Sequence, residues 1–274
     1  MRLPVLVFDI ETLTDLKSGA HLYGLDLPVA DLAQALVKLR RQESGVDFQR
    51  LALHEIVCIS GLWIDEQGSM KIFSFSREQH SESEILTKFL SIFDKRNPTL
   101  VSWNGSQFDL PVILFRAMYH GLSAPSLFDQ GEIDQQKRYN NYQNRYHHRH
   151  VDLMDIMAMF NGRHFQKLDD VAHLLGYPGK RGDGAYHVPE YVHQQEWQKL
   201  TSYCEADVLN TWLVYLRWLL LKGQLLLNDY RDLVQQTIQF LSTQAQHADF
   251  LAIWRDTSQR TEFTAVDFIS FPTH

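Results

Sequence analysis

The chain has 274 residues, a formal net charge of −7 and a hydrophobic content of 45%. A chain of this size can bury a large core, and it is long enough for one large domain or two small ones. The acidic balance excludes a global basic field, so a phosphate-bearing ligand would have to be held by local basic patches or by bound cations.

Cysteine content and hydropathy bear on the compartment. Cys58 and Cys204 are too few for a disulfide framework and form no zinc motif, so we expect buried free thiols in a reducing compartment. The apolar run Leu3–Phe8 is cut short by Asp9 and Glu11, which is not typical of a signal peptide. Apolar runs also fall short of membrane length. These features predict a cytoplasmic protein with no membrane partner.

The first expected element is a strand at Leu3–Glu11. Alternate residues point to opposite faces of a strand, and both faces of this one are apolar until its end. Such a pattern is typical of a central strand that is covered on both sides.

The rest of the chain alternates strand and helix patterns before a helical C-terminal half. Residues Leu122–His150 are polar and irregular, and Tyr177–Pro189 is a loop rich in Gly and Pro. Further strands are expected at Glu55–Ile64, Met70–Phe75 and Thr99–Trp103, the first two forming a hairpin, and helices at Val29–Gln42, Ser83–Phe93, Leu110–Tyr119, Val151–Phe160, Lys167–Leu175, Gln195–Leu221 and Asp229–Ile253. This order predicts an α/β fold with a mixed central sheet flanked by helices.

Three acidic clusters, far apart in the chain, end elements that are expected to meet. Asp9 and Glu11 leave the end of the first strand in the same direction, an arrangement that is costly without a cation between them. Asp109 follows a buried strand, at the sheet edge that ligand sites favour. Tyr203 and Asp207 are four residues apart on a helix and therefore share a face.

Four carboxylates and a tyrosine are suited to phosphodiester hydrolysis with two divalent ions. Magnesium prefers oxygen ligands, so we expect two Mg²⁺ or Mn²⁺ ions held by Asp9, Glu11, Asp109 and Asp207. Asp9 is the expected bridging ligand, and Tyr203 is expected to orient the attacking water. Each cluster alone also fits an ordinary feature: a solvated turn, an Asn-Gly turn with a helix cap, or an exposed helix stripe. Their joint occurrence favours the metal site.

Two residues next to Asp109 are candidates for substrate contact. The Asn104 side chain can hydrogen-bond the turn backbone and fix it. Phe108 can wedge against terminal bases, because proteins that hold single strands stack bases on aromatic rings. Burial of Phe108 in the core is the competing interpretation.

Basic residues later in the chain are further candidates. Arg138 and Arg145 lie in the segment Gln135–His150, where cations alternate with tyrosines, and Lys180 lies in the Gly-rich loop. Cations can follow a phosphate backbone while aromatic rings stack on bases. Solvated loops with incidental tyrosines are the alternative for both segments.

As a set, the three clusters resemble the motifs of a known superfamily. Phe8–Thr12, Asn104–Asp109 and Tyr203–Asp207 resemble motifs one to three of the DEDDy 3′–5′ exonuclease superfamily, which has Asp-Glu-Asp-Asp metal ligands and a tyrosine in motif three. Within it, the chain is similar to stand-alone predicted exonucleases related to the proofreading exonuclease domain of B-family DNA polymerases. Four further stretches carry this likeness: Ile56–Ser60, His150–Asp155, Gly179–Lys180 with Asp183–Gly184, and Tyr203–Thr211.

The resemblance covers most of Leu3–Gly223 and implies a ribonuclease H-like fold with Mg²⁺ or Mn²⁺. We expect an exonuclease domain at 1–223 with an insertion at 14–53, and a C-terminal helical extension at 224–274 that packs on the same domain. The implied activity is metal-dependent 3′–5′ removal of nucleotides from single-stranded ends, DNA rather than RNA, with any replication or repair partner acting in trans. The alternatives are an exoribonuclease of the same fold and a non-catalytic module that binds nucleic acid.

Overall fold

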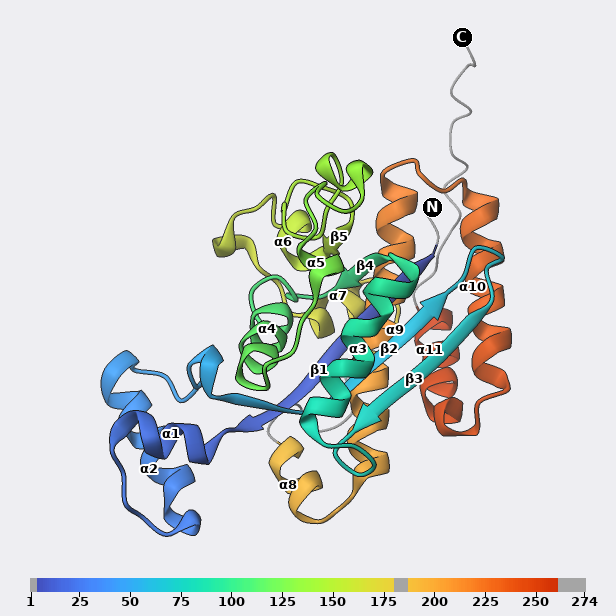
Figure 1. The fold of residues 1–274 in the computed structure, drawn as a ribbon. Helices are drawn as coiled ribbons and strands as arrows, with labels where there is room; N and C mark the ends of the chain where they lie inside the picture. The colour runs from blue at the N-terminus through green and yellow to red at the C-terminus, as the bar shows by residue number, and fades with distance from the viewer. Residues whose placement is uncertain (1–3, 180–186, 261–274) are drawn as a thin grey trace.

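The computed structural model describes residues 4–179 and 187–260, which surround a five-stranded sheet (Figure 1). The strands, in the order in which they lie side by side, are β3 (Met70–Ser76), β2 (His54–Ile64), β1 (Val5–Thr14), β4 (Thr99–Ser102) and β5 (His150–Asp152). β1 is antiparallel to β2 and parallel to β4, and β4 is parallel to β5. The prediction of a mixed sheet flanked by helices is confirmed.

The central strand β1 divides the core into two layers. Val5 and Val7 belong to the cluster formed with α9 (Trp197–Leu221) on one face. Leu6, Phe8 and Ile10 belong to the cluster formed with α3 (Glu82–Arg96) and α4 (Asp109–Tyr119) on the other. Because side chains alternate along a strand, Asp9 and Glu11 lie on the α9 side of the sheet.

The C-terminal region forms two helices, where the sequence pattern predicted one at Asp229–Ile253. α10 (Leu227–Ser242) ends where the hydroxyls of Ser242 and Thr243 bond back to the carbonyls of the last turn. Such bonds compete with continuation of a helix. A 3₁₀ turn, η5 (Ala245–His247), then leads into α11 (Ala248–Arg260).

These two helices pack on α9 and share its core. Leu241, Phe250 and Trp254 are buried in the same cluster as Trp212. The Trp212 Nε1–H donates to Thr237 Oγ1 at 3.0 Å, and both side chains are inaccessible to solvent. The C-terminal helices are thereby joined to the layer that carries the third acidic cluster.

A helical pair occupies the segment between β1 and β2, and it contains one helix that the pattern did not predict. Figure 1 shows α1 (Leu16–Tyr23) and α2 (Val29–Ser44) at the far end of β1, away from the body of the sheet. The side chain of Asp15 caps α1, and Gly24 ends it at a positive φ of 61°. Gly19 packs so closely on Leu36 that a Cβ there would overlap the leucine side chain.

The segment predicted as a helix at Val151–Phe160 begins instead as the edge strand β5. It continues into the short helix α6 (Leu153–Met157). Three residues are too few to show strand periodicity, and pairing with β4 decides the outcome. The remaining short helical elements are α5 (Pro125–Phe128), α7 (Leu168–Leu174), α8 (Val188–His193) and the 3₁₀ turns η1 (Leu51–Leu53), η2 (Gln135–Arg138) and η3 (Gly162–His164). In the part of the chain that the structure describes, helices are too short or too polar to cross a membrane.

Candidate active site

The first acidic cluster lies beside a distortion of the sheet. Ligand atoms of Asp9, Glu11 and Cys204 all lie within 4.8 Å of one another. The pairing of β1 with β2 shifts register between Glu11 and Thr12, which is a β-bulge. Bulges re-aim side chains and are over-represented next to active sites.

Asp109 joins this cluster from the first turn of α4. The backbone N–H of Ile10, between Asp9 and Glu11, donates to Asp109 Oδ1 at 3.2 Å. Asp109 is 4% exposed and Glu11 is 6% exposed, so both carboxyl groups are largely removed from water. The structure thus brings the second cluster against the first.

The turn that leads to Asp109 is held from the edge strand. Asp152 accepts the backbone N–H of Asn104 and that of Ser106, each at 2.9 Å, and also the Ser106 hydroxyl. The sequence suggested that the Asn104 side chain fixes this turn, but the fixing bonds run from the backbone to Asp152. At Gly105, a Cβ would overlap the hydroxyl of Ser102, so only glycine fits.

Electrostatic repulsion is built into this site. Burial raises the pKa of Asp109 to about 7, and the nearby carboxylates of Asp152 and Asp207 add to the shift, while the Ile10 N–H opposes it. Buried carboxyl groups that lie close together disfavour the state in which all of them are ionised. A divalent cation would relieve that repulsion, and oxygen donors are the ligands that Mg²⁺ and Mn²⁺ prefer, so the donor set fits such ions.

Helix α9 supplies the third cluster. Tyr203 and Asp207 are 7% and 4% exposed, and they lie one turn apart on a helix that packs on β1. Between them, the Cys204 thiol lies 3.6 Å from Asp9 Oδ2 and 3.5 Å from the Asp9 carbonyl oxygen. Burial raises the pKa of Cys204 well above its ordinary value, so the S–H acts as a donor to Asp9.

Cys204 is a site residue that the sequence pattern did not reveal. The residues pointed to an inert buried thiol, and its contact with Asp9 joins positions 195 residues apart. The one available signal was its place on α9, next to Tyr203 and one turn before Asp207.

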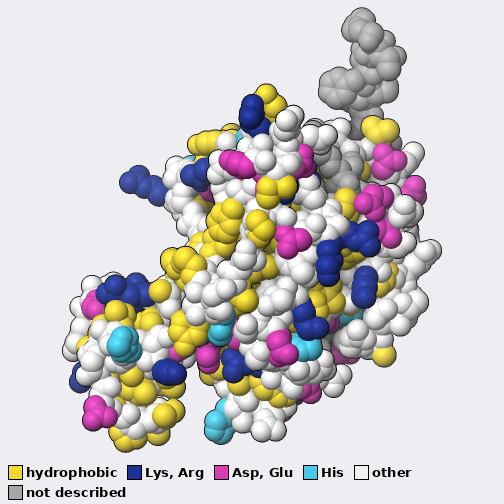
Figure 2. Space-filling model, in the orientation of Figure 1, with side chains coloured by type: hydrophobic (Ala, Val, Ile, Leu, Met, Phe, Trp, Pro, Cys, Tyr) yellow, Lys and Arg dark blue, Asp and Glu magenta, His cyan; other side chains and the backbone are white. Residues whose placement is uncertain are grey.

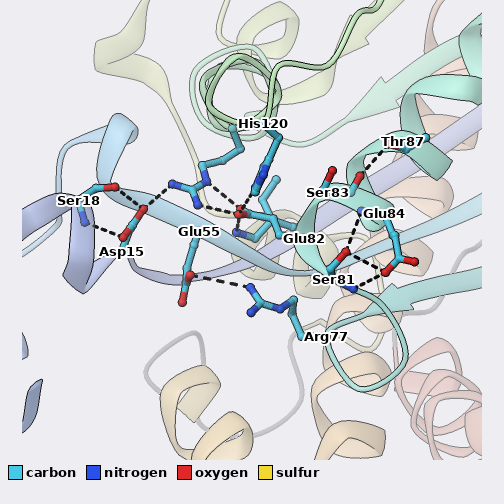
Figure 3. Close-up of polar contacts among 12 residues, drawn as sticks. Asp15, Ser18, Glu55, Arg77, Ser81, Glu82, Ser83, Glu84, Thr87 and His120 are labelled. Atoms are coloured by element: carbon cyan, nitrogen blue, oxygen red, sulfur yellow. Dashed lines mark hydrogen bonds and ion pairs between the residues drawn. The ribbon is translucent and has the colours of Figure 1, made fainter.

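A buried ionic network anchors the helix that carries Asp109. Arg116 of α4 donates to Asp15 and, through two nitrogens, to Glu82 at the start of α3. Figure 3 shows Asp15, Glu82 and His120 of this network. Glu82 also accepts the Ile56 N–H at 2.7 Å and bonds His120 Nε2 at 2.7 Å. The network therefore ties α4 to the ends of β1 and β2 and to α3.

The charges in this network are stabilised by their partners. Burial alone would raise the pKa of Glu82, but hydrogen bonds from Arg116, His120 and Ile56 outweigh it and lower that pKa. Burial opposes the charge of Asp15 in the same way, and Ser18 and Arg116 together lower its pKa.

Phe108 packs against the end of the segment between β1 and β2. Its ring centroid lies 5.5 Å from that of Phe48 and 5.1 Å from that of His54, which it meets edge-on. Phe48 is 56% exposed, so the group opens to solvent beside Asp109. Phe48 and His54 gave no signal in the sequence.

The predicted basic contacts Arg138 and Arg145 lie in the irregular segment before β5. Arg145 pairs with Asp155 at 2.6 Å, and Arg138 is exposed at the end of η2. Arg145 also lines a cavity of about 650 Å³ that includes Thr99. The cavity is also lined by Val151, which pairs with Val101, and Val101 pairs with Val7, two residues before Asp9. Lys180 lies outside the described residues, as do the other residues of 180–186 in the Gly-rich loop.

The central strand was expected to end at Glu11, but it continues to Thr14, so Asp9 and Glu11 lie within it. A mixed sheet with largely buried carboxylates on its central strand defines the class as an α/β protein with a ribonuclease H-like exonuclease fold. The chain belongs to the family described as "Predicted 3'-5' exonuclease related to the exonuclease domain of PolB", whose model matches residues 46–257. The match includes Asp109, Tyr203 and Asp207. It also reaches into α11, further than the likeness inferred from the motifs.

Asp9 and Glu11 lie outside the matched residues, so their place in the site rests on the geometry. No protein of curated function matches this chain.

Proposed function

We propose that this protein is a metal-dependent 3′–5′ exonuclease that removes nucleotides from single-stranded 3′ ends, with DNA preferred to RNA. The bond from the Ile10 N–H to Asp109 Oδ1 carries the proposal, because it joins the first two acidic clusters. The repulsion that raises the pKa of Asp109 adds Asp207 to the same group. Membership of a family of predicted exonucleases supports the reaction class.

In this proposal Asp9, Glu11, Asp109 and Asp207 hold two Mg²⁺ or Mn²⁺ ions. Such ions acidify the attacking water and neutralise charge on the leaving oxygen. Tyr203 orients the water through its hydroxyl. Asp152 and Arg116 contribute by fixing the turn before Asp109 and the helix after it.

A time course on 3′ and 5′ end-labelled strands tests the proposal. DNA and RNA, single-stranded and duplex, would be incubated with Mg²⁺, Mn²⁺ or EDTA. We expect stepwise shortening from the 3′ end of single-stranded DNA, with Asp109→Asn as the inactive control. Faster degradation of RNA would favour an exoribonuclease. Binding of strands without shortening under any metal condition would favour a non-catalytic module.

The control variant is chosen for its shape. Asp109→Asn keeps an oxygen that accepts the Ile10 N–H and removes only the negative charge. Loss of cleavage in this variant is therefore attributable to metal binding and not to a collapsed turn.

A further inference from the structure

On the α3 face of the sheet, opposite the acidic cluster, an exposed hollow is lined by both cationic and aromatic side chains. It measures about 370 Å³ and lies between β3 and α3. Figure 2 shows lysine and arginine side chains gathered over this region, with hydrophobic surface among them. Its cations are Lys71, Lys88, Lys95 and Arg96, and its aromatic residues are Trp63, Phe73 and Phe75.

The aromatic floor follows from the register of the sheet. Lys71, Phe73 and Phe75 alternate along β3 and so share one face, and Trp63 is directly opposite Lys71 on β2. Gly61, opposite Phe73, leaves space that a Cβ would fill, because that atom would lie 2.6 Å from the Phe73 ring. The rings of Phe73 and Phe75 are 4.9 Å apart.

The cationic wall comes mainly from α3. Lys88 and Lys95 are seven residues apart, two helical turns, and both are exposed. The Lys88 ammonium lies 5.7 Å from the centre of the Phe75 ring. Within the described residues, none of the four cations of this hollow forms an ion pair, and no acidic residue lines it. The helix dipole accounts for cations in the last turn of α3, and Lys88 lies one turn after Glu84, whose pKa it helps to lower. Neither effect applies to Lys71.

Exposed cations beside aromatic faces complement phosphates that carry bases. Single strands bind proteins through a positive groove with rings on which bases stack. The hollow, or groove, lies at the same height along the strands as the acidic cluster, on the opposite face of the sheet. Phe75 pairs with Ile59, and Ile59 pairs with Ile10, which lies between Asp9 and Glu11. Two strand spacings, about 10 Å, separate Phe75 from Ile10.

From this geometry we infer that the groove between β3 and α3 binds a single-stranded segment of nucleic acid, as a second contact outside the catalytic cluster. The inference rests on the proposed function for the identity of the substrate. Substrates of about 30 nucleotides would engage the groove, and those of about four would be too short, given site sizes of about 4–16 nucleotides.

Binding of a labelled 30-nucleotide DNA strand in EDTA tests the groove without requiring cleavage. The test variant is Lys88→Gln with Lys95→Gln. Its control is Lys222→Gln with Arg231→Gln, exposed cations that lie outside the groove and change the net charge equally. We expect about tenfold weaker binding in the test variant only, and a salt slope reduced by about 1.4, because each lost phosphate contact contributes about 0.7. Equal losses in both variants, or an unchanged slope, would overturn the inference.

Two further readouts test whether a nucleic-acid strand occupies the groove. Strand binding is expected to quench the tryptophan fluorescence because a base stacks on Trp63. Trp63→Phe should therefore remove part of this quenching, and quenching identical to that of wild type would count against the groove.

Cleavage of a four-nucleotide substrate with Mg²⁺ should be the same in the lysine variant as in wild type. Tighter capture of polyglutamate than of an oligonucleotide of equal charge would assign the groove to an acidic protein partner and overturn the inference.

The two proposals fail in different ways. Groove-dependent binding without cleavage would overturn the nuclease and leave the groove standing. Cleavage with binding that does not depend on Lys88 and Lys95 would overturn the groove alone.

Discussion

At the scale of single residues, the site depends on groups that are close to one another but remote in sequence. Asp109 Oδ1 contacts the backbone of a residue 99 positions earlier, and Cys204 contacts Asp9 across 195 positions. Each contact gives a carboxyl group a fixed direction. The acidic residues are therefore pre-positioned by hydrogen bonds to groups that are not themselves proposed to bind metal.

The proposed role of Tyr203 leads to a kinetic prediction. Tyr203→Phe removes the hydroxyl and keeps the buried ring, which packs with Val57 and Cys58. We expect kcat to fall about 10²–10⁴-fold, as for a positioned acid–base group, while metal affinity is retained. Steady-state kinetics on a short DNA strand would measure this. The loss should be equal in kcat and kcat/KM, because the contact matters in the transition state. Turnover near that of wild type would remove Tyr203 from the mechanism.

Whether a site residue could be predicted depends on whether its position follows from the local sequence or from tertiary contacts. Asp9, Glu11 and Asp109 could be predicted because each follows an apolar run typical of a strand, although β1 continues to Thr14 and Asp109 begins α4. Tyr203 and Asp207 could be predicted because helical spacing places them on one face. The contacts of Asp152 and Cys204 could not be predicted, because they depend on which elements meet in three dimensions. Phe48 reaches Phe108 only through the path of the α1–α2 segment.

At the scale of elements, the Arg116 network holds together four of them around the site. Its carboxylates, Asp15 and Glu82, are 5% exposed, so they rely on Arg116 for compensation. Figure 3 also shows a contrasting pair, the exposed Arg77 with the half-buried Glu55, 3.8 Å apart. The two pairs allow a buried and a more exposed interaction to be compared in one protein.

Arg116→Met should destabilise the protein by about 3–5 kcal/mol at pH 7, because it leaves two buried carboxylates without their partner. Arg77→Met is the matched control and should cost about 0–1 kcal/mol. Both can be measured by urea unfolding. The pKa values of Asp15 and Glu82 are lowered in the folded state, so their stabilisation is present above the unfolded pKa values and is lost as pH falls through the folded ones. The effect of Arg116→Met should therefore shrink below about pH 4, and an effect that does not depend on pH would contradict the role given to these carboxylates.

The contact between α9 and α10 gives a second element-scale prediction. Thr237→Val keeps the shape of the side chain but leaves the buried Trp212 N–H without an acceptor. Such a loss costs about 1–3 kcal/mol. Thr237→Ser retains the hydroxyl and should recover most of the stability. Equal stability of the Val and Ser variants in thermal unfolding would show that the Trp212 bond contributes nothing.

Helices and strands could be predicted where a hydrophobic pattern extends over many residues. The β1 strand and the 25-residue helix α9 show clear patterns because many successive residues are buried. The edge strand β5 has three residues and owes its conformation to pairing with β4, as at Leu100 and His150. The break between α10 and α11 follows the bonds of the Ser242 and Thr243 hydroxyls, and His247 just beyond it lies buried 3.2 Å from Glu205.

At the scale of the whole molecule, the fold places two chemically opposite surfaces on the two faces of one sheet. Asp9 and Glu11 lie on the α9 face, where Asp109 joins them from α4, and the α3 face carries the exposed cations of the proposed strand-binding groove. A net charge of −7 would repel nucleic acid at a distance, so the groove and the bound cations would have to provide local attraction. This division links the overall charge of the chain to its proposed substrate.

Metal binding should couple to the stability of the whole protein through Asp109. The pKa of Asp109 is raised to about 7 in the metal-free fold, above its ordinary value of 3.8. The folded state therefore binds more protons than the unfolded state between these values, and its contribution to stability falls as pH rises from about 4 to 7. A proton on Asp109 competes with a cation for the same oxygen atoms. Mn²⁺ should consequently stabilise the protein more at pH 8 than at pH 5.5.

Thermal unfolding with and without Mn²⁺ at these two pH values measures the coupling. At pH 8 and an ion concentration 100 times the Kd, the folded state should gain about 2.7 kcal/mol. Asp109→Asn is the control, since it keeps the acceptor for Ile10 and removes the titrating charge. Without metal it should be more stable than wild type above pH 7, where repulsion from Asp207 and Asp152 is relieved, and Mn²⁺ should add little. If wild type and variant respond equally to Mn²⁺ at both pH values, Asp109 is not part of the ion-binding group. The contact between the first two acidic clusters would then not indicate a metal site.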